Sequence, residues 1–109
     1  MTLEELQHRS WTTNEAHGFH ETIEDRNFVA KVMLVVSELS EAVEEWRGGR
    51  GKSYDGENGK PEGIGPELAD AVIRIADICQ MEGIDLAYDT ERKMKYNETR
   101  PYRHGGKRI

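Results

Sequence analysis

Cysteine is almost absent from this sequence, and this absence limits the metals that the chain can bind. Cys79 is the only cysteine among 109 residues, so an internal disulfide and a zinc site built from several thiolates are both excluded. Cys79 lies within an apolar helical pattern, and we expect it to be a small buried hydrophobic residue. A metal site in this chain must therefore use other ligands.

Long apolar runs are also missing. No stretch approaches the roughly 18 to 20 uninterrupted apolar residues that a membrane-spanning helix needs. Glu4 and Glu5 stand where a secretory signal peptide would carry basic residues followed by an apolar run. We therefore expect a cytoplasmic protein that has no membrane partner.

Basic charge is scarce outside the carboxy-terminal region. Residues 92–109 hold seven basic residues and one acid, whereas the net charge of the whole chain is -6, so the other 91 residues carry -12. Nucleic acid is not an expected partner, because duplex binding draws its affinity from an extended basic face. An acidic body with a basic tail instead suggests a cation held by carboxylates and an anion, such as a phosphate chain, held between both.

The length of the chain and the spacing of its apolar residues predict one all-α domain over residues 1–109. Helical spacing occurs over residues 3–15, where the pattern is weakest, and over 27–46, 66–82 and 85–97. Asp25 and Asp85 are expected to cap the second and last helices, and Pro66 suits a first turn. Without strand alternation or repeats, we predict about four helices in a bundle, with the second and third at its centre.

Two features of this domain indicate a partner subunit and a mobile segment. Apolar residues surround nearly the whole helix over residues 68–79, so we expect it to be buried between neighbours, in its own chain or in a second copy. Residues 48–65 contain seven glycines and almost no large apolar residue, and we expect a mobile loop there. A domain of this size buries only a modest share of its surface, which also favours an oligomer.

Acidic residues on the second and third predicted helices form two stripes. At 100° per residue, Glu38, Glu41 and Glu45 share one stripe that borders the apolar face of the second helix. Glu67 and Asp70 repeat the three-residue spacing on the third helix. Like charges at this spacing repel, and a hard divalent cation with oxygen ligands from both helices would relieve the repulsion. Magnesium is the favoured metal, and the alternative is a pair of solvated faces.

Histidine offers little support for a softer metal. Ferritin-like di-iron bundles require two Glu-x-x-His pairs, and in this chain only Glu5-Leu-Gln-His8 fits. His17 and His20 have no further ligands at suitable spacing, so we expect both to be ordinary loop residues.

The acidic motifs resemble those of a known family. Glu38-x-x-Glu41, a glycine-rich gap and Glu67-Leu-Ala-Asp70 resemble the E-x-x-E and E-x-x-D motif pair of the all-α nucleoside triphosphate pyrophosphohydrolases, the MazG-like group. Residues 93–107 also look like the carboxy-terminal segment of many short members. The resemblance implies Mg²⁺-dependent cleavage of a ribo- or deoxynucleoside triphosphate between the α and β phosphates, which gives a monophosphate and pyrophosphate.

The resemblance also implies roles for individual residues. Glu38, Glu41, Glu67 and Asp70 would hold Mg²⁺, with Mn²⁺ as the alternative ion, and Glu38 and Glu41 would be catalytic. Our own hypothesis is that Glu38 is the general base, because it starts the motif. The substrate-binding residues would be Lys93, Asn97, Arg100, Arg103 and Lys107. The alternative for the basic tail is a disordered solubilising end.

One departure from the family pattern leaves a second function open. Many relatives carry two adjacent glutamates at the start of the first motif, and here the earlier position is Ser37. Glu45, one turn beyond Glu41, is the candidate to compensate. The alternatives to an enzyme are a catalytically weakened module that binds nucleotide and metal, and a purely structural helical dimer. The family further implies a homodimer or a dimer of dimers, and we predict that residues 48–65 cover the bound nucleotide.

Overall fold

The computed structural model describes residues 1–106 and 108, and it confirms the all-α fold. In chain order the elements are α1 (Leu3–Ala16), a 3₁₀ turn (Glu24–Arg26), α2 (Phe28–Gly48), β1 (Tyr54–Asp55), a 3₁₀ turn (Glu57–Gly59), β2 (Pro61–Glu62), α3 (Ile64–Glu82), α4 (Leu86–Thr99) and the one-turn α5 (Arg103–Gly106). Lys107, one of the expected substrate-binding residues, lies outside the described residues.

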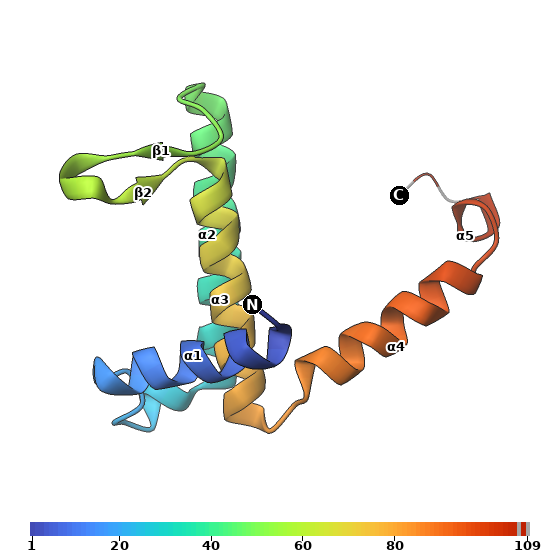
Figure 1. Ribbon diagram of the computed structural model, residues 1–109, viewed down its shortest axis with the longest axis horizontal. Coiled ribbons are helices and arrows are strands. Elements are labelled where there is room, and N and C mark those ends of the chain that lie inside the picture. Colours follow the sequence, from blue (N-terminus) through green and yellow to red (C-terminus); the bar gives the residue numbers. More distant parts are fainter. Residues whose placement is uncertain (107, 109) are drawn as a thin grey trace.

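The centre of the fold is the pair formed by α2 and α3, which lie side by side, with α1 crossing them near one end (Figure 1). Val35, Ala71 and Ile78 form the buried core, and Val32 packs against it. Cys79 is buried as expected. Among the described residues no large side chain is completely buried, so the core of a single chain is small.

Side chains that accept backbone hydrogen bonds set where the helices begin. The Asp85 Oδ1 atom accepts a hydrogen bond from the Tyr88 amide at 3.0 Å and caps α4 as predicted. The prediction that Asp25 caps α2 is wrong, because the Asn27 side chain accepts from the Ala30 amide at 2.9 Å. Asp25 instead accepts from the amide of Thr22 at 3.0 Å, within the turn that precedes α2.

The glycine-rich segment is not a plain loop, because it contains an antiparallel hairpin in which Tyr54 faces Glu62. The Tyr54 hydroxyl donates to Glu45 Oε2 at 3.1 Å, and the Gly65 amide donates to the Lys52 carbonyl at 2.7 Å. These two bonds fasten the hairpin to α2 and to the start of α3. Strands of two residues have too few positions for alternation to reveal them in the sequence.

Helix α4 is an arm that leaves the body of the molecule (Figure 1). None of its described residues is buried. Its base is held by Gln7, whose Nε2 donates to the Ile84 carbonyl at 2.8 Å and whose Oε1 accepts from the Leu86 amide at 3.3 Å. The radius of gyration of 16.4 Å exceeds the roughly 13 Å expected for a compact domain of this length.

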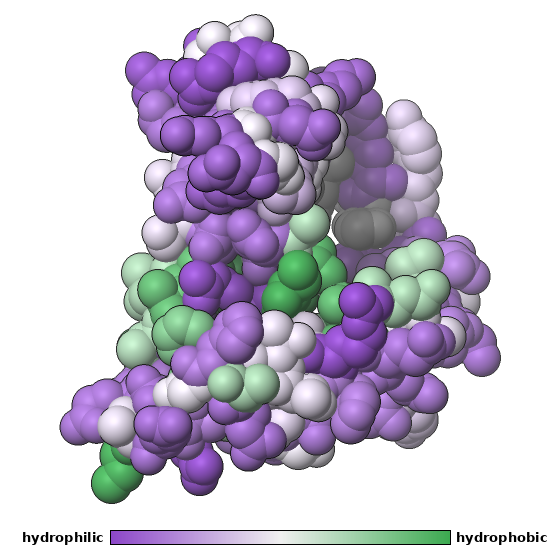
Figure 2. All heavy atoms as spheres, turned by 60° about the vertical axis from the view of Figure 1, so that its left-hand side comes forward, coloured by the Kyte–Doolittle hydropathy of each residue, from purple (hydrophilic) through white to green (hydrophobic). Residues whose placement is uncertain are grey.

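Apolar side chains remain exposed along α2 and α3. Figure 2 shows green apolar patches between the purple polar surfaces of the molecule. The exposed apolar residues of α2 include Val29, Met33, Val36, Leu39, Val43 and Trp46, and those of α3 include Leu68, Val72 and Ile75. None of the described helices combines the length and the apolar character that crossing a membrane requires.

Candidate metal centre

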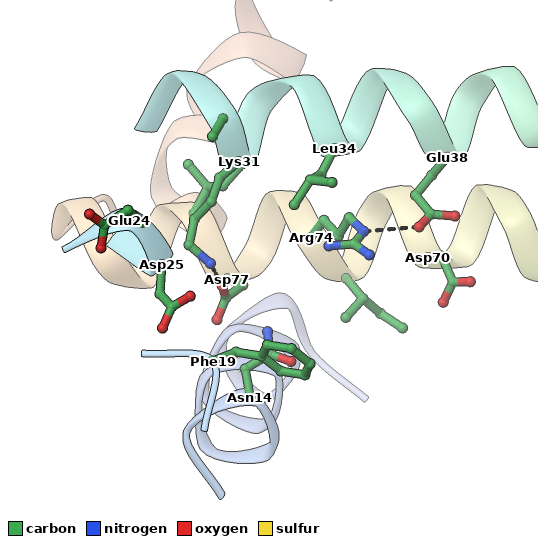
Figure 3. A pocket seen from close by; sticks show the side chains of 13 residues that line it. Asn14, Phe19, Glu24, Asp25, Lys31, Leu34, Glu38, Asp70, Arg74 and Asp77 are labelled. Carbon is green, nitrogen blue, oxygen red and sulfur yellow. Dashed lines mark hydrogen bonds and ion pairs between the residues drawn. The ribbon is translucent and has the colours of Figure 1, made fainter. Parts of the chain in front are cut away.

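The pairing of α2 with α3 brings the two acidic motifs together. One carboxylate oxygen from each of Glu38, Glu67 and Asp70 lies within 4.8 Å of the others. Glu41 is close enough to shift the pKa of both Glu38 and Glu67. We call these four residues the carboxylate cluster. Figure 3 shows the Glu38 side chain of α2 pointing toward α3, near Asp70.

Arg74 supplies the cation that pairs directly with this cluster. Its Nε donates to Glu38 Oε1 at 3.0 Å, one helical turn beyond Asp70 (Figure 3). Burial acts to raise the pKa of Glu38, but the hydrogen bond from Arg74, together with interactions with Glu41 and Glu67, outweighs burial and lowers the pKa. Glu38 is therefore an ionised carboxylate at neutral pH.

The second oxygen of Glu38 has no partner. Glu38 is 9% exposed, and its Oε2 atom is buried without a hydrogen bond. A buried ionised oxygen without a donor is costly, because it has lost its hydration and gained nothing in return. An oxygen of this kind inside a group of carboxylates is the expected ligand of a cation.

Glu67 and Asp70 show that the cluster holds too little positive charge. Burial, followed by the neighbouring Glu41 and Glu38, raises the pKa of Glu67 to about 7. Burial and the charge of Glu38 raise the pKa of Asp70, although Arg74 and Lys60 oppose the increase. Glu67, with its pKa near 7, is an acid that a divalent cation would ionise.

Two cavities meet at the carboxylate cluster. The first, which we call the helix cavity, has a volume of about 420 Å³ and contains Asn14, Phe19 and Lys31 in its lining (Figure 3). The second, the hairpin cavity, has a volume of about 550 Å³ and lies between the β1–β2 hairpin and the start of α3. Both are lined by Asp70 and Ile73. The cluster can therefore contact a ligand that extends to either side.

Glu45 does not join the carboxylate cluster. Its Oε2 accepts hydrogen bonds from the Tyr54 hydroxyl at 3.1 Å and from Arg50 Nε at 3.3 Å. The carboxylate that we expected to compensate for Ser37 is thus engaged in holding the hairpin. Ser37 itself is exposed on α2.

The expected substrate-binding residues stand apart from the cluster within one chain. Lys93 and Asn97 lie on α4, and Arg100 and Arg103 follow it, on the arm that runs away from α2 and α3 (Figure 1). The Lys93 ammonium and the Arg100 guanidinium lie 5.4 and 5.8 Å from the centre of the Tyr96 ring. One chain alone therefore does not bring these basic groups to the carboxylates.

The sequence pattern did not predict a buried junction that lies near the helix cavity. Asp77 accepts from Lys31 Nζ at 3.1 Å and contacts His20 Nε2 at 3.3 Å, and both His20 and Asp77 are nearly inaccessible to solvent. The His20 ring stacks on Trp11 with centroids 3.7 Å apart. His20 is thus no ordinary loop residue. The one available signal was Asp77, an acid that directly precedes the apolar pair Ile78 and Cys79.

This junction fastens the segment between α1 and α2 to α3. Phe19, Glu24 and Asp25 of that segment line the helix cavity, and the Arg26 Nε atom donates to the His20 carbonyl at 3.1 Å. The shape of the cavity therefore depends on His20 and Asp77, although neither belongs to the carboxylate cluster.

None of the known protein families, curated proteins or solved structures with which we compared the chain matches it. The chemistry of the site is therefore inferred from the residues of this chain alone. Four carboxylates, one paired arginine and two flanking cavities suit a hard cation together with an elongated ligand.

Proposed function

We propose that this protein is a Mg²⁺-dependent nucleoside triphosphate pyrophosphohydrolase, which cleaves between the α and β phosphates to give a nucleoside monophosphate and pyrophosphate. The observation that carries the proposal is the convergence of Glu38, Glu67 and Asp70 from two helices within 4.8 Å, beside a buried Glu38 oxygen without a partner. The motif resemblance supplies the substrate class. The protein is accordingly proposed to be an enzyme.

Glu38, Glu41, Glu67 and Asp70 would hold the ion, because carboxylate oxygens are the ligands that Mg²⁺ prefers, and Mn²⁺ is the alternative. When bound, the ion would neutralise phosphate oxygens and lower the pKa of a coordinated water. Arg74 occupies Oε1 of Glu38, which leaves Oε2 to bind the cation or to accept a proton from the attacking water. Glu38 and Glu41 remain the proposed catalytic residues.

The helix cavity is the proposed nucleoside site. Leu34, Ile73 and Ile78 give it apolar walls, and Phe19 adds an aromatic ring. Asn14 and the buried pair of Lys31 with Asp77 give it polar groups. A mostly apolar pocket with a few fixed polar groups is typical of sites for small organic ligands.

We also propose that the working unit is a homodimer or a dimer of dimers. One chain exposes 8414 Å², whereas a folded monomer of its mass is expected to expose roughly 6,200 Å². The apolar residues exposed on α2 and α3 would be covered by a second copy. A second copy could also bring Lys93, Asn97, Arg100 and Arg103 of its arm to the substrate.

The decisive experiment measures pyrophosphate and monophosphate formed from a panel of ribo-, deoxy- and modified nucleoside triphosphates, with and without Mg²⁺. We expect both products in equal amounts, with turnover reduced about 100-fold or more in Glu38→Gln and Asp70→Asn, as is usual when a group that stabilises the transition state is removed. Glu44→Gln is the matched control, because Glu44 lies on the same helix, is 67% exposed and pairs with Arg47. Release of phosphate with a diphosphate, or full activity of both site variants, would contradict the proposal.

The second candidate is a regulatory module that binds nucleotide and metal without turnover. It is favoured by Ser37, because Glu45 is engaged by Tyr54 and Arg50 and does not replace the missing glutamate. Binding of a Mg²⁺-nucleotide without any product, together with turnover gained in Ser37→Glu, would identify this function. A purely structural dimer would bind neither Mg²⁺ nor nucleotide.

A further inference from the structure

The β1–β2 hairpin brings a lysine to a second cavity that adjoins the helix cavity at Asp70. The hairpin cavity is lined by Ser53, Lys60 and Pro61 from the hairpin and by Gly65, Pro66 and Asp70 from α3. Asp70 and Ile73 belong to both cavities. A substrate whose reacting phosphate lies at the cluster would therefore place its nucleoside in one cavity and its remaining phosphates in the other.

The charges of the two cavities determine which cavity would take the nucleoside and which would take the phosphates. Glu24, Asp25 and Asp77 line the helix cavity together with two acids of the cluster. Its two basic residues are already paired, Lys31 with Asp77 at 3.1 Å and Arg74 with Glu38 at 3.0 Å. The hairpin cavity contains Lys60, and its one acid is Asp70 of the cluster itself. Phosphates would be repelled by the acids of the helix cavity and attracted by the lysine of the hairpin cavity.

Lys60 is fixed at its backbone and has a free ammonium group. The Lys60 carbonyl accepts from the Gly56 amide at 2.7 Å, and the Lys60 amide donates to the Glu57 carbonyl at 3.2 Å. No ion pair between described residues involves Lys60. Its charge is therefore available to a ligand of the hairpin cavity.

The backbone at the start of α3 offers few hydrogen-bond donors to a bound phosphate, so a side chain such as Lys60 must supply them. The Gly65 amide is used by the Lys52 carbonyl at 2.7 Å, and Pro66 has no amide hydrogen. The positive end of the helix dipole favours an anion there, but a phosphate also needs a group that donates hydrogen bonds. Lys60 and the Ser53 hydroxyl are the lining side chains that can donate them.

We propose that Lys60, assisted by Ser53, binds the β and γ phosphates of the substrate, so that the hairpin cavity is the subsite of the pyrophosphate leaving group. This inference rests on the proposed function and adds to it a residue outside the acidic motifs and the basic tail. Lys60 neutralises the charge that the leaving group gains when the bond to the α phosphate breaks.

Product inhibition tests this assignment, because each product occupies one side of the cluster. In Lys60→Gln we expect pyrophosphate to inhibit about 10- to 100-fold more weakly, and KM for the triphosphate to rise by a similar factor, as for loss of a charged hydrogen bond. Inhibition by the nucleoside monophosphate should stay within about twofold of the wild-type value, because Lys60 does not line the helix cavity. Lys60→Arg should restore most of the pyrophosphate inhibition.

Lys52→Gln is the matched control, since Lys52 belongs to the same exposed segment and does not line the hairpin cavity. Equal inhibition constants for pyrophosphate in wild type and Lys60→Gln would overturn the inference and leave the proposed function standing. Equal weakening of both products, or the same effect in Lys52→Gln, would also overturn it, because only the net charge would then matter. A wild-type protein that does not hydrolyse any triphosphate would refute the proposed function and this inference with it.

Discussion

At the scale of single residues, Glu67 shows how the charge of the cluster depends on pH. Burial and its neighbours Glu41 and Glu38 raise its pKa from 4.5 to about 7 in the folded protein without metal. A raised pKa in the folded state stabilises the fold while the group is protonated, and this stabilisation is lost as the pH rises through the folded value. The metal-free protein should therefore lose stability between about pH 4.5 and pH 7 on account of Glu67.

A bound divalent cation should reverse this pattern, because it requires ionised carboxylates. We expect Mg²⁺ binding to release up to about one proton at pH 6 and few at pH 8, and the affinity to rise with pH before levelling off above about 7. Calorimetric titration in two buffers with different ionisation enthalpies measures the number of protons released. Glu67→Gln should bind Mg²⁺ more weakly and lose most of this pH dependence. Equal proton release by the wild type at pH 6 and pH 8 would contradict the prediction.

Asp77 holds two partners at a site nearly inaccessible to water. Asp77→Ala leaves Lys31 and His20 without their carboxylate, and we expect the free energy of unfolding to fall by about 3 to 5 kcal/mol. Glu44→Ala is the control, because it breaks an ion pair whose side chains are 67% and 68% exposed and should cost less than about 1 kcal/mol. Urea unfolding of the metal-free proteins measures both. Similar costs for the two variants would show that the buried junction is not a major source of stability.

The residues of the carboxylate cluster and those of the buried junction at Asp77 differ in how far the sequence could predict them. The convergence of Glu38, Glu67 and Asp70 followed from three-residue spacing on two helices that were expected to pack. His20 lies in an irregular segment, where no period links it to Asp77 or Trp11, so its burial depends on a tertiary arrangement that spacing does not contain. For the same reason the sequence could not show that Glu45 would be engaged by Tyr54 and Arg50.

At the scale of the elements, Gly63 is the joint between the hairpin and α3. Its φ of 118° and ψ of -175° belong to a region that is essentially limited to glycine. A Cβ atom at this position would also lie 2.9 Å from the Lys52 carbonyl oxygen. The close approach of residue 52 to the start of α3, which shapes the hairpin cavity, therefore requires glycine.

Gly63→Ala should lower the free energy of unfolding by about 1 to 3 kcal/mol or more, through backbone strain together with the steric conflict. It should also weaken inhibition by pyrophosphate, because the hairpin moves. Gly59→Ala is the control: its φ of 76° is also positive, but a Cβ atom there meets nothing within 4 Å. We expect a cost of only about 1 kcal/mol for the control. Urea unfolding and inhibition assays on both variants measure these effects. A larger effect of Gly59→Ala than of Gly63→Ala would contradict the prediction.

The helices could be predicted from the sequence because they depend on local spacing, whereas the hairpin could not. Apolar spacing was sufficient for the four long helices, and Asp85 was correctly predicted as a cap. Asp25 and Asn27 are both good capping residues two positions apart, and the turn that begins at Glu24 decides between them by engaging Asp25 with Thr22. The hairpin depends on the bonds of Tyr54 to Glu45 and of Gly65 to Lys52, which are contacts with other elements.

At the scale of the whole molecule, a single chain exposes more surface than a compact monomer of its mass is expected to expose. Its exposed area exceeds by about 2,200 Å² the value expected for a monomer of this mass, and the arm formed by α4 has no buried residue. Six of the exposed apolar residues of α2, from Val29 to Trp46, recur every three to four positions, which is the spacing of a helix that packs against another helix. These features together favour self-association along α2.

We therefore expect light scattering at micromolar concentration to give at least twice the chain mass of 12.5 kDa. Val36 is 48% exposed in the middle of the apolar stripe of α2, and Val36→Glu should shift the protein toward the monomer, because it places a charge in an apolar interface. Ser37→Glu adds the same charge one position along, where the side chain points off the stripe, and should keep the assembly intact. If the arm of one copy contacts the substrate of the other, turnover per chain should fall with the dimer fraction in Val36→Glu. A stable wild-type monomer that retains full turnover would contradict both self-association and the arrangement in which the arm serves a second copy.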